Sequence, residues 1–172
     1  MNNLFALQNI GFKITWKLVY IGMNGYDEIQ AILTRDEVKE YIITRLEDKN
    51  VELDRIVRLI CEYNNSLEFD KIIKNLSDIE NSIYVVEKRK WRAFLLKSLL
   101  DNKKNDSIQG MIDLLDFWTS MGLPEGNPMP IPESNDKEIL QEYFGDLSYL
   151  NVIERNQQWL QKEIQEILDL DL

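Results

Sequence analysis

Histidine is absent from the sequence, and cysteine occurs once, at Cys61. Because histidine is the commonest general base and the commonest transition-metal ligand, its absence excludes most hydrolase mechanisms. A single cysteine cannot form an internal disulfide, which agrees with a reducing compartment. Phosphate-binding loops of the Gly-x-Gly-x-x-Gly and Gly-Lys-Ser/Thr types are also missing. We therefore expect no catalytic residue and no cofactor.

Long apolar runs are lacking as well. Charged residues make up 29% of the chain, and no apolar run approaches the roughly 18 residues that a membrane-spanning helix needs. The first residues, Met1–Gln8, show neither the basic region nor the long apolar core of a signal peptide. We expect a soluble, cytoplasmic protein with no membrane partner. Its 172 residues, 44% of them hydrophobic, are enough for one domain spanning residues 1–172.

Proline is confined to one short stretch. All four prolines lie between Leu123 and Ser134, where they exclude a helix and predict one long loop of extended character. Helical spacing of apolar residues dominates elsewhere. We expect an all-α fold, either a single-domain helical bundle or a short α-solenoid-like stack of about seven helices, with the proline-rich loop before the last two.

Capping patterns and apolar stripes place the individual helices. Thr34 and Glu37 form a capping-box pattern, which starts a helix over 35–49. Cys61 lies on the apolar stripe of its helix together with Val57, which predicts a packed core thiol. Further stripes predict helices near residues 14–23, 53–61, 65–76, 79–102, 107–121 and 147–168. The helix after Asp106 should end at Gly122 and should direct one stripe inward: Ile108, Met111, Ile112, Leu115 and Trp118.

Charge is divided unevenly along the chain. Residues 1–104 contain 17 Lys and Arg against 16 Asp and Glu, whereas residues 105–172 contain 3 against 14. The first part is therefore near neutral and the second is strongly acidic. An acidic field attracts basic surfaces and repels the phosphates of nucleic acid. We expect a basic protein partner and no direct contact with nucleic acid.

The basic run Lys88-Arg89-Lys90-Trp91-Arg92 stands out against this acidity. One interpretation is a nucleic-acid patch in which Trp91 stacks on bases. The alternatives are a solvated helix face, or an internal counterpart of the acidic C-terminal part. The overall pI of 4.6 favours the two alternatives.

Carboxylate pairs leave one class of enzyme open. Helical proteins can hold Mg²⁺ or Mn²⁺ with acids three or four residues apart on one helix face. The pairs available here are Asp113/Asp116, Glu138/Glu142 and Glu163/Glu166. They resemble the acidic helix motifs of all-α nucleoside triphosphate pyrophosphohydrolases, which would imply a metal-dependent phosphohydrolase. The spacing between the pairs differs from that family, and no comparable set of Lys and Arg lies nearby. A solvated acidic surface explains the pairs more simply.

Several segments together resemble a family of uncharacterised bacterial proteins of similar length, catalogued as a domain of unknown function. They are the stretch Glu87–Leu100, the acidic helix after it, and the motifs Gly122-Leu123-Pro124-Glu125 and Met129-Pro130. The opening Ile14-Thr15-Trp16, with Tyr20 and Gly22, is similar to the start of the same family. This resemblance covers most of the chain and implies no activity.

In architecture and charge the chain also resembles immunity proteins of bacterial toxin–immunity systems, including contact-dependent inhibition. In such systems a small acidic helical protein blocks a basic nuclease toxin. The resemblance implies a non-enzymatic inhibitor whose acidic surface fills the phosphate-binding groove of the toxin; a scaffold with no toxin partner is the other non-enzymatic alternative. We expect Met129 and Ile131 to serve as apolar anchors. The acidic contacts expected are Asp113, Asp116, Glu125, Glu133, Asp136, Glu138, Glu142 and Asp146.

Overall fold

The computed structural model describes residues 2–45, 53–102, 106–129 and 145–171. These residues form eight α-helices, and the only strand-like pairing among them is an isolated bridge between Tyr26 and Ile29. The helices are α1 (Asn3–Ile10), α2 (Trp16–Asn24), α3 (Arg35–Arg45), α4 (Leu53–Cys61), α5 (Ser66–Ile79), α6 (Tyr84–Asp101), α7 (Ser107–Ser120) and α9 (Asp146–Leu170). The all-α class predicted from the sequence is confirmed. None of the helices in the described ranges is both long enough and apolar enough to cross a membrane.

The helices group into two compact units. Unit 1 comprises Met1–Trp91 and Ile167–Leu172, and unit 2 comprises Arg92–Glu166, so the divisions fall within α6 and α9. The expectation of one domain over residues 1–172 stays a prediction, and each unit is described by itself. Helix α1, in unit 1, was not predicted from the sequence.

Side-chain caps fix the helix ends that the sequence indicated. The Thr34 backbone N–H donates to Glu37 Oε2 at 2.9 Å, and the Glu37 backbone N–H donates to Thr34 Oγ1 at 3.3 Å, so the capping box of α3 is confirmed. Asn65 and Asp106 cap α5 and α7 in the same way. At the other end of α7, Gly122 adopts φ +72° and its N–H donates to the Thr119 carbonyl, while the Leu123 N–H reaches Trp118. This is the Schellman arrangement, which favours glycine at that position.

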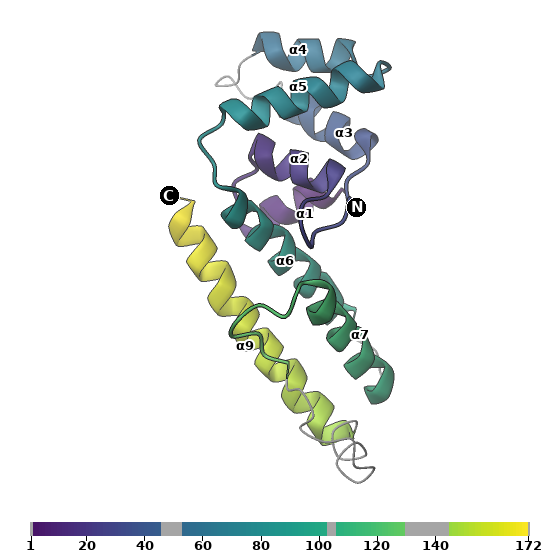
Figure 1. Cartoon of the computed structure of the whole chain (residues 1–172), viewed down its shortest axis with the longest axis vertical. Helices are drawn as coiled ribbons and strands as arrows, with labels where there is room; N and C mark the ends of the chain where they lie inside the picture. Colours follow the sequence, from purple (N-terminus) through teal and green to yellow (C-terminus); the bar gives the residue numbers. More distant parts are fainter. Residues whose placement is uncertain (1, 46–52, 103–105, 130–144, 172) are drawn as a thin grey trace. The chain divides into compact units, whose positions relative to one another are not determined.

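In unit 1, α2 packs against α5, α1 packs against α3, and α4 lies beside α3 and α5 (Figure 1). Trp91, from the start of α6, has no exposed surface and donates its indole N–H to the Leu18 carbonyl at 2.9 Å. Gly22 of α2 makes room for this indole, because a Cβ there would lie 2.4 Å from Trp91 Cζ2. The buried apolar residues of α3 are Val38, Tyr41 and Ile42.

Helix α4 corrects one sequence prediction. Val57 is 49% exposed and Cys61 is exposed, so Cys61 is not the packed core thiol that its position on the stripe indicated. Leu59, from the other side of the helix, is completely buried instead. The helix packs along one side only, and a helix at an edge buries a narrow stripe that periodicity alone does not select.

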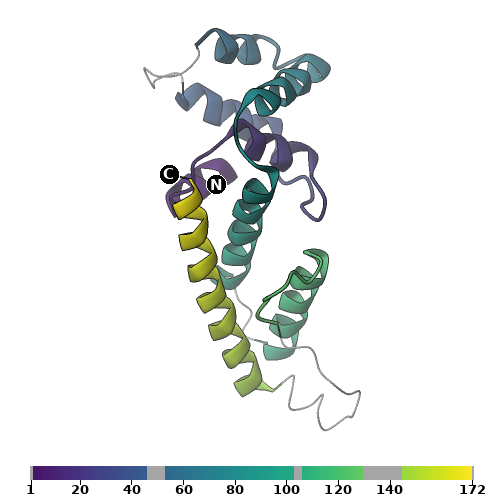
Figure 2. The same cartoon turned by 60° about the vertical axis from the view of Figure 1, so that its left-hand side comes forward.

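In unit 2, the second part of α6, α7 and most of α9 surround a shared core. Trp118 of α7 is completely buried, lies edge-on to Trp159 with ring centroids 4.8 Å apart, and donates its indole N–H to Asn156 Oδ1 at 2.7 Å. After α7 the chain reverses direction through Gly122 (Figure 2). Met129 ends this described segment and is 5% exposed. The remaining buried core residues of unit 2 are Ala93, Leu96, Leu100, Met111, Leu114, Tyr149, Val152, Ile153 and Leu160.

Candidate functional site

The basic run at the start of α6 is largely an internal feature. Trp91 is buried and hydrogen-bonded to Leu18, so its ring is not available to stack on bases. Lys90 is also completely buried. Lys88 reaches outward but is engaged by Asp27 and Glu28 at 2.8 and 2.7 Å. The run therefore does not form the aromatic-centred patch that one interpretation of the sequence required.

Within unit 1, Lys90 is held by two carboxylates and a backbone carbonyl. Its Nζ lies 2.7 Å from Asp171 Oδ1 and 3.2 Å from Glu87 Oε2, and it donates to the Lys13 carbonyl at 3.0 Å. Burial raises the pKa of Glu87, against the attraction of Lys90 and a hydrogen bond from the Thr15 hydroxyl, while the charge of Asp171 adds to the increase. The cluster is enclosed, which suits a structural role better than a catalytic one.

Arg92 has a similar role within unit 2. Its Nη2 lies 2.8 Å from Glu163 Oε1, and its guanidinium carbon lies 5.3 Å from the centroid of the Trp159 ring. Glu163 and Asp171 both belong to the acidic C-terminal part of the sequence. The interpretation of the basic run as an internal counterpart of that part is thus confirmed for Lys90 and Arg92.

The carboxylate pairs do not assemble into a metal centre in the ranges that the structure describes. No group of three or more Cys, Asp and Glu side chains there is placed to hold a metal ion. Glu163 is buried against Arg92, and Glu166 lies 3.8 Å from Lys162. The pair Glu138/Glu142 lies outside the described residues. Nothing in the described geometry therefore favours the metal-dependent alternative.

The outward face of α7 carries the acidic residues that the sequence selected. Asp116 is exposed and Asp113 is half-buried, and residues 107–120 contain no Lys or Arg. On the same side, Ile108 is 55% exposed and Ile112 is 37% exposed. We call Ile108, Gln109, Ile112, Asp113 and Asp116 the α7 face. It combines accessible apolar side chains with negative charge and contains no cation.

The exposure of Ile108 and Ile112 corrects part of the inward stripe expected for this helix, whereas Met111 and Trp118 of that stripe are buried as predicted. The buried residues are Gly110, Met111, Leu114 and Trp118. The cause is a close approach at Gly110, where a Cβ would lie 2.3 Å from the Tyr149 hydroxyl. Because Tyr149 of α9 packs against this glycine, Leu114 and Trp118, one and two turns further along, face inward as well.

A cavity of about 210 Å³ opens beside the α7 face. Among the described residues that line it, Asp113 is the only charged one; the others are Leu99, Leu100, Asn102, Gly110, Leu114, Tyr149 and Ile153. Burial raises the pKa of Tyr149, and the negative charge of Asp113 raises it further. The Tyr149 hydroxyl therefore stays protonated across the physiological range. The cavity is a mainly apolar pocket with one carboxylate in its wall.

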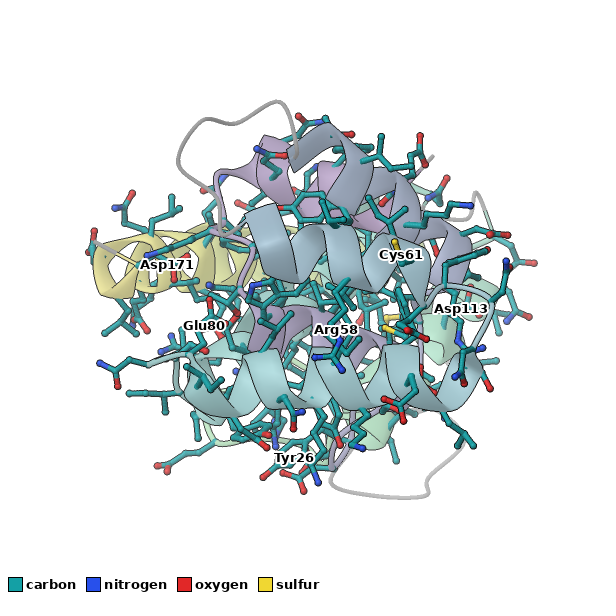
Figure 3. The ribbon with its side chains drawn as sticks, turned by 90° about the horizontal axis from the view of Figure 1, so that it is seen from above. Tyr26, Arg58, Cys61, Glu80, Asp113 and Asp171 are labelled. Atoms are coloured by element: carbon teal, nitrogen blue, oxygen red, sulfur yellow. The ribbon has the colours of Figure 1, made fainter. Side chains whose placement is uncertain are left out.

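A second cavity lies in unit 1, where Arg58 sits between α4 and α5 (Figure 3). Its volume is about 250 Å³, and its lining carries Arg58, Lys71 and Glu68 above apolar residues of α5. Lys71 lies 3.7 Å from Glu68, which leaves Arg58 as the excess charge of the lining. The lining of this cavity therefore carries a positive charge, whereas a basic partner would require a negative one.

The structure divides the predicted partner-binding residues into three groups. Asp113, Asp116 and Glu125 lie at the surface of unit 2, the first two on the α7 face and the third in the segment after Gly122. Met129 is 5% exposed and packs within unit 2, and its role as an apolar anchor stays a prediction. Asp146 is the first residue of α9, and the structure does not describe its side chain. The others also lie outside the described residues: Ile131, Glu133, Asp136, Glu138 and Glu142.

Gly110 and Tyr149, which shape the cavity, were not selected as site residues. A glycine inside a helical pattern is a sequence signal of close approach by a neighbour. The isolated Gly110 between Ile108 and Ile112 gave that signal. Its partner could not be identified without the fold.

Comparisons with known proteins place the chain in a family. No curated protein and no solved structure matches it significantly. A family model described as "Uncharacterized protein conserved in bacteria (DUF2247)" matches residues 5–164, which is most of the chain. This match confirms the resemblance to an uncharacterised bacterial family that the sequence motifs indicated. The protein therefore belongs to the DUF2247 family of conserved bacterial proteins.

Proposed function

We propose that this protein is a bacterial immunity protein, a non-enzymatic inhibitor that binds a basic toxin domain and covers its active site. The single observation that carries the proposal is the α7 face. Its exposed isoleucines and its two carboxylates, with no cation in the helix, provide an apolar and acidic contact surface. Glu125, exposed in the following segment, extends the negative charge.

The charge distribution supports a basic partner. Residues 105–172 carry 14 acidic side chains against 3 basic ones, and two of the acids, Glu163 and Asp171, are used in internal ion pairs. Charge of this density increases association rates with a basic surface by roughly 10- to 1,000-fold at low salt. A nuclease active site is basic because it binds phosphates, so an acidic surface can occupy it.

Exposed apolar side chains on the α7 face would slow the dissociation of the partner. Ile108 and Ile112 are one turn apart and both project outward, where each loses water-exposed surface on binding. Burying a side chain of this type contributes roughly 1.5–3 kcal/mol. The carboxylates of the α7 face would then orient the partner while the isoleucines slow its dissociation.

The test first asks whether the reading frame upstream of this gene encodes a large secreted protein with a basic C-terminal domain, and then uses that domain. Mixing the two proteins should abolish nucleic-acid cleavage, and calorimetry should show binding that weakens steeply as salt is raised. Replacing Asp116 by Asn should weaken binding by about tenfold at low salt. The matched control is Asp78→Asn on α5, which removes the same charge from an exposed site in unit 1. Uninhibited cleavage, or affinity that does not change with salt, would refute the proposal and leave a scaffold role.

A further inference from the structure

The structure assigns the cavity beside Asp113 to one lysine side chain of a protein partner. This inference rests on the proposed function, because it names the group that the α7 face would capture. The cavity is lined by residues of α6, α7 and α9 within unit 2, together with Asn102 directly after α6.

The volume of the cavity limits the size of the group that can enter it. Drug-sized ligands and cofactors occupy pockets of roughly 300–1,000 Å³, which exceed the approximate 210 Å³ available here. A lysine side chain has five non-hydrogen atoms, which at roughly 30 Å³ each require about 150 Å³. One such chain fits with little empty space. A tryptophan side chain, with twice as many atoms, does not.

The lining matches the two parts of a lysine side chain. Leu99, Leu114 and Ile153 provide an apolar wall for four methylene groups. Asp113, Asn102 and Tyr149 place three oxygen-bearing side chains in the same cavity. An ammonium group has three donors and no acceptor, so these oxygens suit it better than they suit an anion or an apolar tip.

Asp113 supplies the charge that makes the pocket selective. Its Oδ1 accepts a hydrogen bond from the Gln109 side-chain amide at 2.7 Å, and within the described ranges no Lys or Arg forms an ion pair with it. A lysine entering the pocket would therefore bring to this carboxylate a cation that the described part of the chain does not supply. A charge-assisted hydrogen bond in a partly desolvated pocket is the kind of contact that dominates binding energy at interfaces.

Close packing at Gly110 forms one wall of the pocket. Tyr149 packs directly against Gly110, so closely that a side chain at this position would clash with the tyrosine. The Tyr149 side chain and Leu114 both line the cavity. The pocket is thus present without a partner. Preformed pockets lose less entropy on binding than surfaces that must reorganise.

The experiment titrates the full chain with Nα-acetyl-lysine N-methylamide and follows backbone amide signals by NMR. We expect saturable shifts confined to the pocket residues, with a dissociation constant on the order of millimolar. Asp113→Asn should weaken binding by about tenfold, the loss of one charge-assisted hydrogen bond. Tyr149→Phe keeps the ring but removes the hydroxyl, and should weaken binding by about threefold.

Two controls test whether the binding is specific for the pocket and for the charge of the ligand. Asp78→Asn on α5 removes the same charge from an exposed site that does not line the cavity, and it should leave the affinity unchanged. The norleucine analogue has a similar apolar chain without the charge, and should bind at least about tenfold more weakly. Equal binding of lysine and norleucine analogues, equal loss in the two aspartate variants, or tighter binding of the arginine analogue would each overturn the assignment.

Failure of this inference can be told apart from failure of the proposed function. If the toxin domain is inhibited while Asp113→Asn leaves its binding unchanged, the face binds without the pocket and the pocket assignment is wrong. If the lysine amide binds the pocket but no toxin domain is inhibited, the anchor chemistry holds and the immunity role is wrong.

Discussion

Lys90 and Asp171 lie far apart in the sequence, yet Lys90 Nζ is 2.7 Å from Asp171 Oδ1 in unit 1. The same Asp171 accepts a hydrogen bond from the Lys13 backbone N–H through its other oxygen, at 3.1 Å. The end of the chain is thereby joined to the start of α6 and to the segment between α1 and α2. Because the lysine is completely buried, its charge is compensated by these protein groups and not by water.

Removing the positive charge of Lys90 should destabilise the protein. Lys90→Met leaves the carboxylates of Glu87 and Asp171 without the ammonium between them, and should lower the free energy of unfolding by about 3–5 kcal/mol. Urea unfolding measures the change. The exposed Lys74→Met on α5 is the control and should change the free energy by less than about 0.5 kcal/mol. A loss at Lys90 no greater than at Lys74 would contradict the structural importance of the cluster.

Glu87 should make stability depend on pH in a defined direction. Burial raises its pKa above the ordinary value of 4.5, so the folded state binds this proton more tightly than the unfolded state. Its contribution is therefore fully present below the unfolded pKa and is lost as pH rises through the folded pKa. Compared with Glu87→Gln, the wild type should be relatively more stable at about pH 4 than at about pH 8. A constant difference between the two proteins would contradict this result.

Glu37 should show the opposite dependence. Burial by itself would raise its pKa, but hydrogen bonds from the Thr34 and Asn3 backbone amides and the Thr34 hydroxyl lower it overall. Its contribution is present above the unfolded pKa and is lost as pH falls through the folded pKa. Glu37→Gln should cost about 1 kcal/mol near neutral pH and progressively less in acid. Thermal unfolding over a pH series measures this, with the exposed Glu40→Gln as the comparison.

Trp118 and Asn156 give a test of the core of unit 2. Asn156→Ala removes the acceptor of the buried indole N–H, and should lower the free energy of unfolding by about 1–3 kcal/mol. Asn151→Ala, exposed on the same helix, should change it by less than about 0.5 kcal/mol. Urea unfolding followed by tryptophan fluorescence compares the two variants. Similar losses of unfolding free energy in the two variants would show that the Trp118–Asn156 hydrogen bond does not stabilise unit 2.

Gly22 tests the packing of unit 1. Gly22→Ala would place a methyl group 2.4 Å from Trp91 Cζ2 and 2.6 Å from Leu33 Cδ1, so these side chains must move. We expect a loss of about 1–3 kcal/mol from overpacking, although alanine favours the helix itself. Asn24→Ala at the exposed end of α2 is the control. A more stable Gly22→Ala variant would mean that the tryptophan moves aside at no cost.

Local signals in the sequence were sufficient for several helices. The Thr34–Glu37 pair, Asn65 and Asp106 each start a helix in the structure, because a cap is a contact between neighbours in the chain. Gly122 ends α7 for the same local reason. Helix α1 was missed although its caps were present. Asn2 accepts from the Leu4 backbone N–H, and Gly11 adopts φ +104° after the last turn.

The inward faces were harder to assign. On α7, a stripe with Ile108 and Ile112 and another with Gly110 and Leu114 both satisfy the helical period, and both contain Trp118. The choice between them depends on Tyr149, which approaches Gly110 from a distant part of the chain. Met129 was selected from the sequence as an apolar anchor of the proline-rich loop, and in the structure it is buried in unit 2. Neither outcome follows from spacing, since both depend on which element packs alongside.

The sequence by itself determined the helical class, the separation of charge along the chain, and the lack of histidine chemistry. These properties follow from composition and from contacts between near neighbours. Only the tertiary structure decided how the charges are used. Lys90 and Arg92 are buried against Asp171 and Glu163, whereas Asp116 is left at the surface. The physical reason is that an ion pair forms between side chains that folding brings together, and a charge has no partner in the sequence until the chain has folded.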